Sequence, residues 1–104
     1  MEDVYIIGAS STRFQKWPDK TYKDLTREAY MSALSDAGLS DGGSIESSWF
    51  GNCGMWTEDQ GSVRGQVCFT PLVREGLFPE RVPMVNVEGG CATASMALNG
   101  AWKD

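Results

Sequence analysis

The chain has 104 residues, with 14 acidic and 9 basic side chains, no histidine and a net charge of −5. Phosphate-binding surfaces need clustered lysine and arginine, so the charge balance argues against nucleic-acid and anionic-membrane partners. The longest apolar runs are only a few residues, far too short for a membrane span. The first residues, Met1-Glu2-Asp3, lack the positive region of a signal peptide. We therefore expect a cytoplasmic protein with at most one small domain in this chain.

The first strand–helix unit is expected within the first forty residues. Val4-Tyr5-Ile6-Ile7 is a continuous apolar run ending at Gly8, as in a strand buried on both faces. Apolar side chains then recur at helical spacing from Thr21 to Ala37. Thr21 is the expected N-cap of this helix, and Gly38 is the expected residue just past its end.

The middle of the chain predicts a second unit. Residues 45–50 are expected to form a strand, and residues 54–59 a loop. A helix is expected over 61–69 and a shorter helical turn over 72–75, because Thr70-Pro71 disfavours one uninterrupted helix.

The third unit ends the chain. Residues 82–87 are mostly apolar and predict a strand, after which Glu88-Gly89-Gly90 predicts a sharp turn. Cys91 is expected to open a third helix, rich in alanine and other small residues. Repeated strand–helix units predict an α/β fold with a parallel sheet. Three strands make a thin sheet, so we expect the fold to be incomplete in this chain alone.

Cys91 is the candidate nucleophile because of its position in this turn. At the start of a helix, unpaired N–H groups and the positive end of the helix dipole favour a thiolate. The same N–H groups could hold a negatively charged oxygen formed during acyl transfer. The alternative interpretation is a buried structural thiol, because free cysteine packs like a small hydrophobe. Glu88 is expected to support the turn by accepting hydrogen bonds from backbone N–H groups.

Metal, disulfide and nucleotide sites are not indicated. The cysteines Cys53, Cys68 and Cys91 are spread singly, with no CxxC pair and no histidine to complete a zinc site. They are expected to be free thiols. The loop after the first strand lacks the GxGxxG spacing of dinucleotide-binding loops. Because no histidine is present, the base for a catalytic Cys91 must lie outside this chain.

Several segments, in order, resemble the thiolase superfamily, especially the sterol carrier protein X-like and acetyl-CoA acetyltransferase-type thiolases. Residues 87–95 (VEGGCATAS) resemble the family's nucleophile loop. Residues 4–8 (VYIIG), 12–14 (TRF) and 33–39 (ALSDAGL) resemble its leading strand and first helix. The resemblance implies that residues 1–104 are the N-terminal part of the thiolase N-terminal domain, a fragment of a larger enzyme.

The resemblance also implies an activity. Cys91 would accept the acyl group of a 3-ketoacyl-CoA, with coenzyme A as a substrate and no covalently bound cofactor. The reaction would be thiolytic cleavage or the reverse Claisen condensation. In this family the histidines and second cysteine lie later in the chain, and neither Cys53 nor Cys68 matches that second cysteine. The family further implies a homo-oligomer, a dimer or tetramer, with a second acyl-CoA-binding subunit as another possible partner.

Other functions remain open on the sequence. Ala94 stands where the family often has glycine, and a ketoacyl synthase has a similar Cys-Ala-Thr run. A thiolase-like aldolase, which need not use the cysteine covalently, is a further alternative. The third is a non-catalytic subunit that binds acyl-CoA or completes a complex. The chain length of the acyl group and the direction of the reaction are not indicated.

Overall fold

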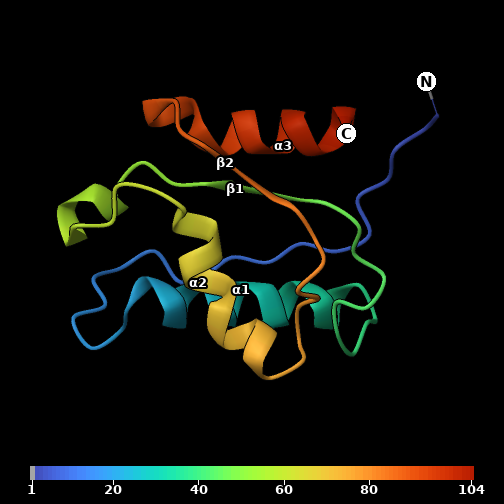
Figure 1. Cartoon of the computed structure of the whole chain (residues 1–104), viewed down its shortest axis with the longest axis horizontal. Coiled ribbons are helices and arrows are strands. Elements are labelled where there is room, and N and C mark those ends of the chain that lie inside the picture. Colours follow the sequence, from blue (N-terminus) through green and yellow to red (C-terminus); the bar gives the residue numbers. More distant parts are fainter. Residues whose placement is uncertain (1) are drawn as a thin grey trace.

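The computed structural model describes residues 2–104, and Figure 1 shows a pair of strands between two layers of helices. Its elements in chain order are α1 (Tyr22–Asp36), β1 (Ser48–Gly51), the 3₁₀ helix η1 (Met55–Glu58), α2 (Arg64–Arg74), β2 (Met84–Val87), the 3₁₀ helix η2 (Gly90–Ala92) and α3 (Thr93–Lys103). Strands β1 and β2 are parallel neighbours. Helix α3 lies on one side of them, and α1 and α2 on the other. The expected α/β class is confirmed.

Local signals determine both ends of α1. The Thr21 hydroxyl accepts a hydrogen bond from the Asp24 N–H, and the Asp24 carboxylate accepts one from the Thr21 N–H, which forms a capping box. At the other end Gly38 has a φ of +75°, and the N–H groups of Gly38 and Leu39 donate to the carbonyls of Ser35 and Leu34. This pattern is a Schellman motif. The predicted N-cap and terminating glycine are both confirmed.

The strands present alternate side chains to the two helical layers. Phe50 faces α2, where a Cβ added at Gly65 would lie 2.7 Å from the Phe50 Cβ. Trp49 faces α3, where a Cβ added at Gly100 would overlap the Trp49 ring. Such close approaches require glycine, because any larger residue would separate the helix from the strand. Glycines in α2 and α3 therefore allow both helices to pack closely on the sheet.

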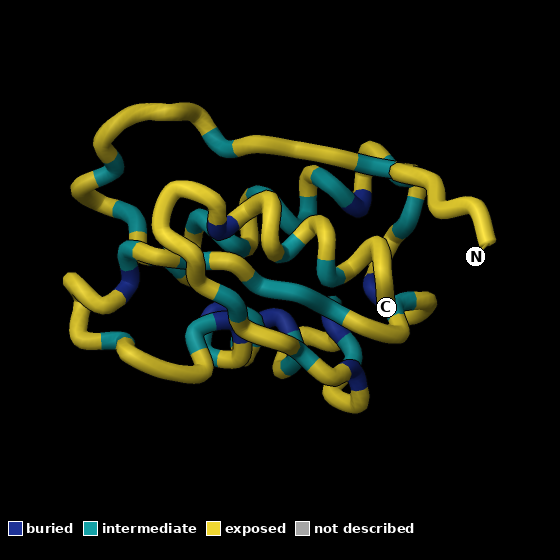
Figure 2. Tube along the Cα trace, turned by 90° about the horizontal axis from the view of Figure 1, so that it is seen from above, coloured by how far each residue is buried: buried dark blue, intermediate teal, exposed yellow. Residues whose placement is uncertain are grey.

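The core lies between α1, α2 and the segment leading into β2. Leu72, Phe78 and Val82 are buried together. Tyr30 and Phe69 pack against them, and the Tyr30 and Phe69 rings meet edge to face with centroids 5.3 Å apart. Figure 2 shows that buried positions are few and that much of the chain is exposed.

The predicted first strand is wrong for the described chain. Val4, Tyr5, Ile6 and Ile7 lie outside any strand, and all of them are exposed. A strand needs a neighbour for its N–H and C=O groups, and β1 and β2 pair only with each other within residues 2–104. The segment is held to α1 just downstream, where the Ala9 N–H donates to the Asp36 carboxylate at 2.9 Å.

The predicted break at Pro71 is also wrong, because α2 continues through this residue. Proline in a helix interior costs about 3 kcal/mol. Its neighbours Cys68 and Leu72 are each only 1% exposed. Burying a side chain such as leucine contributes about 1.5–3 kcal/mol, enough for the packing on α1 to offset much of the cost.

Two smaller differences concern loops and strand lengths. The expected loop at 54–59 contains η1, and its Met55 side chain is buried. The two observed strands are shorter than the predicted ranges of 45–50 and 82–87. Within residues 2–104, no helix is long and apolar enough to cross a membrane.

Candidate active site at the Cys91 turn

Cys91 lies in η2, between β2 and α3 in the chain. Figure 1 shows that a short turn joins the carboxyl end of β2 to α3. The Cys91 side chain is exposed. The prediction that Cys91 opens the third helix needs correction, because Cys91 is part of η2 and α3 begins two residues later at Thr93. The carboxyl ends of parallel strands are the usual location of ligand sites in α/β folds.

The turn depends on the backbone of Gly90 and on the side chain of Glu88. Gly90 has a φ of +57°, a left-handed conformation that glycine adopts without strain. The Glu88 carboxylate accepts a hydrogen bond of 2.7 Å from the Gly90 N–H. This is a charge-assisted bond, which is stronger than one between neutral groups. Glu88 thus holds the residue immediately before Cys91.

A second side chain holds the turn from the other side. The Thr93 hydroxyl accepts a hydrogen bond of 3.0 Å from the Gly89 N–H and donates one of 2.7 Å to the Gly90 carbonyl. Thr93 was not selected from the sequence, where it was one of many small residues in the third helix. The available signal was its spacing, because Thr hydroxyls commonly bond backbone groups three or four residues earlier.

Some of the expected oxyanion-binding N–H groups are already bonded. The Ala92 N–H donates to the Gly89 carbonyl at 3.0 Å, and the Thr93 N–H donates to the Gly90 carbonyl. These bonds form the 3₁₀ turn that contains Cys91. The two N–H groups after Cys91 therefore maintain the turn, and neither of them is free to bind a charged oxygen in this conformation.

The start of α3 is packed directly on β1. A Cβ added at Gly51 would lie 2.9 Å from the Thr93 Cγ2 atom and 3.3 Å from the Ala97 Cβ. Both distances are below ordinary van der Waals contact, so a side chain at Gly51 would displace the helix. The position of the Cys91 turn thus depends on a glycine in the neighbouring strand.

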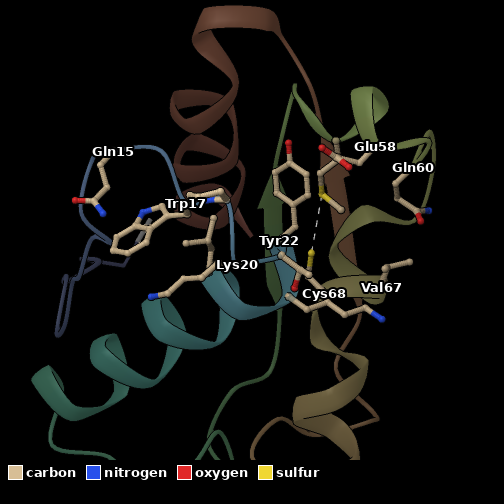
Figure 3. A pocket seen from close by; sticks show the side chains of 13 residues that line it. Gln15, Trp17, Lys20, Tyr22, Glu58, Gln60, Val67 and Cys68 are labelled. Carbon is tan, nitrogen blue, oxygen red and sulfur yellow. Dashed lines mark hydrogen bonds between the residues drawn. The ribbon is translucent and has the colours of Figure 1, made fainter.

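The other cysteines occupy different environments. Cys68 is 1% exposed, its Sγ lies 3.9 Å from the Met55 Sδ, and burial raises the pKa of its thiol. Figure 3 shows Cys68 in the wall of an open cavity of about 680 Å³ between the first turn of α1, η1 and α2. Cys53 is exposed in the loop after β1. Within residues 2–104, no three His, Cys, Asp or Glu side chains form a group that could hold a metal ion.

No family model matches the chain, but individual proteins do. Acetyl-CoA acetyltransferase of Methanothermobacter thermautotrophicus is 32% identical over 100 residues, covering 94% of this chain and 24% of that protein. Acetyl-CoA acetyltransferase of Methanocaldococcus jannaschii is 33% identical over 101 residues, covering 97% and 24%. Sterol carrier protein 2 of Gallus gallus is 32% identical over 98 residues, covering 91% and 16%.

The chain spans a quarter or less of the length of these relatives, since the matches cover 24%, 24% and 16% of them. The matches nevertheless include more than nine tenths of the chain, at 91% to 97%. They agree with the thiolase resemblance of its motifs and with its α/β fold. The chain is therefore similar, over more than nine tenths of its own length, to a part of two acetyl-CoA acetyltransferases and of sterol carrier protein 2, and it resembles a thiolase-like fragment.

Proposed function

We propose that the protein containing this chain is a thiolase and that Cys91 accepts the acyl group. One observation carries the proposal: the exposed Cys91 thiol lies in a glycine turn between a parallel strand and a helix, in a relative of acetyl-CoA acetyltransferases. An exposed thiol in such a turn is accessible to a thioester substrate, whereas a buried thiol such as Cys68 is not.

The reaction has two steps. The Cys91 thiolate attacks the C3 carbonyl carbon of a 3-ketoacyl-CoA, and the bond between C2 and C3 then breaks. Its electron pair remains on C2, which takes a proton to give acetyl-CoA, while Cys91 keeps the shortened acyl group as a thioester. The thiolate of free coenzyme A then attacks this thioester, releasing a shorter acyl-CoA and regenerating the Cys91 thiolate. The reverse sequence is a Claisen condensation.

Proton transfers in this scheme need groups outside the chain. The sequence has no histidine, and the Cys68 thiol is buried in the layer of α1 and α2. We therefore assign the acid and base roles to the remaining part of the protein. We also propose that coenzyme A is a substrate and that the whole protein is a homo-oligomer, as implied by the family.

Thiolysis of a 3-ketoacyl-CoA by the natural-length protein tests the proposal. Replacing Cys91 with alanine is expected to reduce kcat by several orders of magnitude, because the covalent step is lost. Cys53→Ala is the matched control, since it removes another exposed thiol and is expected to leave kcat unchanged. Full thiolysis activity in Cys91→Ala would contradict the proposal and favour a non-catalytic, acyl-CoA-binding role for this chain.

A further inference from the structure

We propose that Thr93 is a positioning residue for Cys91, and that Gly51 of β1 in turn fixes the position of Thr93. The inference rests on the proposed function, because it explains how the nucleophile is held for acyl transfer. Thr93, the first residue of α3, contacts both the Cys91 turn and Gly51 of β1, so β1 also helps to hold the turn in place.

Thr93 is placed to control the backbone on the N-terminal side of Cys91. Its hydroxyl accepts from the Gly89 N–H and donates to the Gly90 carbonyl, so one oxygen connects the two residues that precede the nucleophile. The Thr93 N–H also donates to the Gly90 carbonyl. The peptide groups around Gly90 are thus held by both the backbone and the side chain of Thr93.

Because Thr93 is buried, its hydrogen bonds to Gly89 and Gly90 hold the conformation of the turn more firmly than the exposed hydrogen bond to Glu88 does. Thr93 is 6% exposed and is the only buried polar residue among residues 2–104. A buried hydroxyl that loses its partners retains a desolvation cost, so the bonded arrangement is favoured over alternatives. Glu88, in contrast, is exposed and can exchange its bond with water.

The methyl group of Thr93 connects the turn to β1. The space above Gly51 is filled by the Thr93 Cγ2 atom, 2.9 Å from the position that a Cβ would occupy. The Thr93 carbonyl oxygen is 3.1 Å from the same position. A side chain at Gly51 would therefore push the first turn of α3 away from the sheet, and the Cys91 turn with it.

The hydroxyl and the methyl group of Thr93 therefore have different roles. The hydroxyl holds the turn, and the methyl sets the distance to β1. Serine retains the first function, whereas valine retains the second. Comparing Thr93→Val with Thr93→Ser therefore shows whether the hydroxyl positions the turn or whether the side chain only fills the space above Gly51.

The test uses the natural-length protein with Thr93→Val, Thr93→Ser and Gly51→Ala. Thr93→Val is expected to lower kcat for thiolysis about 10²-fold with KM unchanged, the order expected when a reacting group moves by about 1 Å. Thr93→Ser is expected to recover most of this loss. Gly51→Ala, which leaves the hydroxyl in place, is expected to lower kcat in the same way as Thr93→Val.

A second readout does not need activity. Cys91 and Cys53 are both exposed and lie in different tryptic peptides, 82–103 and 28–64. Their rates of alkylation by iodoacetamide can therefore be compared by mass spectrometry in the same sample. The ratio of the two rates is expected to change in Thr93→Val and Gly51→Ala, and to stay close to the unsubstituted value in Thr93→Ser.

An unchanged kcat and an unchanged alkylation ratio in Thr93→Val would overturn the inference. Equal losses of kcat in the valine and serine variants would also overturn it, because they would indicate packing alone. If Thr93→Val does not fold, kcat and the alkylation ratio of Gly51→Ala provide the test, and unchanged values of both would overturn the inference. If the unsubstituted protein has no thiolase activity, the proposed function fails, and the alkylation ratio alone still supports or overturns the role of Thr93.

Discussion

Single residues with unusual backbone angles determine where several elements of this chain end. Gly38, Gly76 and Gly90 have φ values of +75°, +73° and +57°. Gly38 and Gly76 terminate α1 and α2 in Schellman motifs, and Gly90 reverses the chain before Cys91. Residues other than glycine pay roughly 1–2 kcal/mol in this conformation.

Gly38→Ala is therefore expected to lower the free energy of unfolding by about 1 kcal/mol. The cost comes only from the backbone, because a Cβ at Gly38 would meet no atom within 4 Å. Urea unfolding followed by circular dichroism measures it. Gly61→Ala is the matched control, since its Cβ would also enter open space but its φ lies outside the left-handed range. Equal losses of stability in Gly38→Ala and Gly61→Ala would contradict the conclusion that the left-handed backbone of Gly38 causes the loss.

The half-buried Tyr30 and the buried Cys68 predict a loss of stability at alkaline pH. Burial raises the pKa of Tyr30, with a further contribution from Asp41, and burial also raises the pKa of Cys68. Each group binds its proton more tightly in the folded chain, so its contribution is complete below its ordinary pKa, 10.0 for Tyr30 and 9.0 for Cys68. That contribution is lost as the pH rises through the folded pKa.

We expect the free energy of unfolding to fall as the pH rises above about 9. Ionised Tyr30 can no longer donate its hydrogen bond of 2.6 Å to the Leu77 carbonyl. Tyr30→Phe should therefore be less stable near neutral pH but should lose less stability above about pH 10. Unfolding curves at several pH values measure both effects. The same alkaline slope with and without the Tyr30 hydroxyl would show that this group is not responsible.

Helices and strands could be predicted from the sequence only where the signals that form them lie close together in the chain. The ends of α1 were predictable because Thr21 and Gly38 act through neighbours in the chain. The strand expected at 4–7 was not, because a strand needs a partner that the local sequence does not reveal. Pro71 was misinterpreted because its local penalty is offset by burial of its neighbours, which is a tertiary effect.

The capping box gives a test at this scale. Thr21→Ala is expected to cost about 1 kcal/mol of stability, because the Asp24 N–H loses its acceptor. Thr21→Ser keeps the hydroxyl and should retain most of the stability. Helix content and urea midpoints of the two variants give the comparison. A serine variant as unstable as the alanine variant would indicate that the methyl group, and not the cap, matters.

The candidate site was only partly predictable for the same reason. A strand, a glycine turn and a helix around Cys91 could be inferred from local sequence, and the structure has all of them. The packing of Thr93 on Gly51 could not, because Gly51 lies 42 positions earlier than Thr93 by their residue numbers and in a strand of its own. Such a contact between residues distant in the chain can be recognised only once the structure shows that α3 packs on β1.

At the scale of the whole molecule, the 104-residue chain has extensive exposed apolar surface. Ile6 is 78% exposed in the N-terminal segment, and Leu98 is 62% exposed on α3. Trp102 and Met96 add to the apolar surface of α3. Large uncovered apolar surfaces mark interaction sites or cause aggregation.

An isolated chain of these 104 residues is therefore expected to self-associate and to bind a hydrophobic dye. Replacing Ile6 and Leu98 together with lysine should reduce both effects, because it introduces charge where apolar side chains are exposed. Light scattering coupled to size-exclusion chromatography measures the association. A monomeric, dye-negative unsubstituted chain would contradict this expectation. Lysine at two exposed polar positions, Ser32 and Ser95, controls for added charge alone.

If Cys91 carries the acyl group during the reaction, that group can be located on the protein by mass spectrometry. The natural-length protein is incubated with a 3-ketoacyl-CoA without free coenzyme A, quenched in acid and digested with trypsin. The three cysteines fall in separate peptides, 28–64, 65–74 and 82–103. We expect an acyl adduct on peptide 82–103 that is abolished by Cys91→Ala. An unmodified peptide 82–103, or an adduct on either of the other peptides, would contradict it.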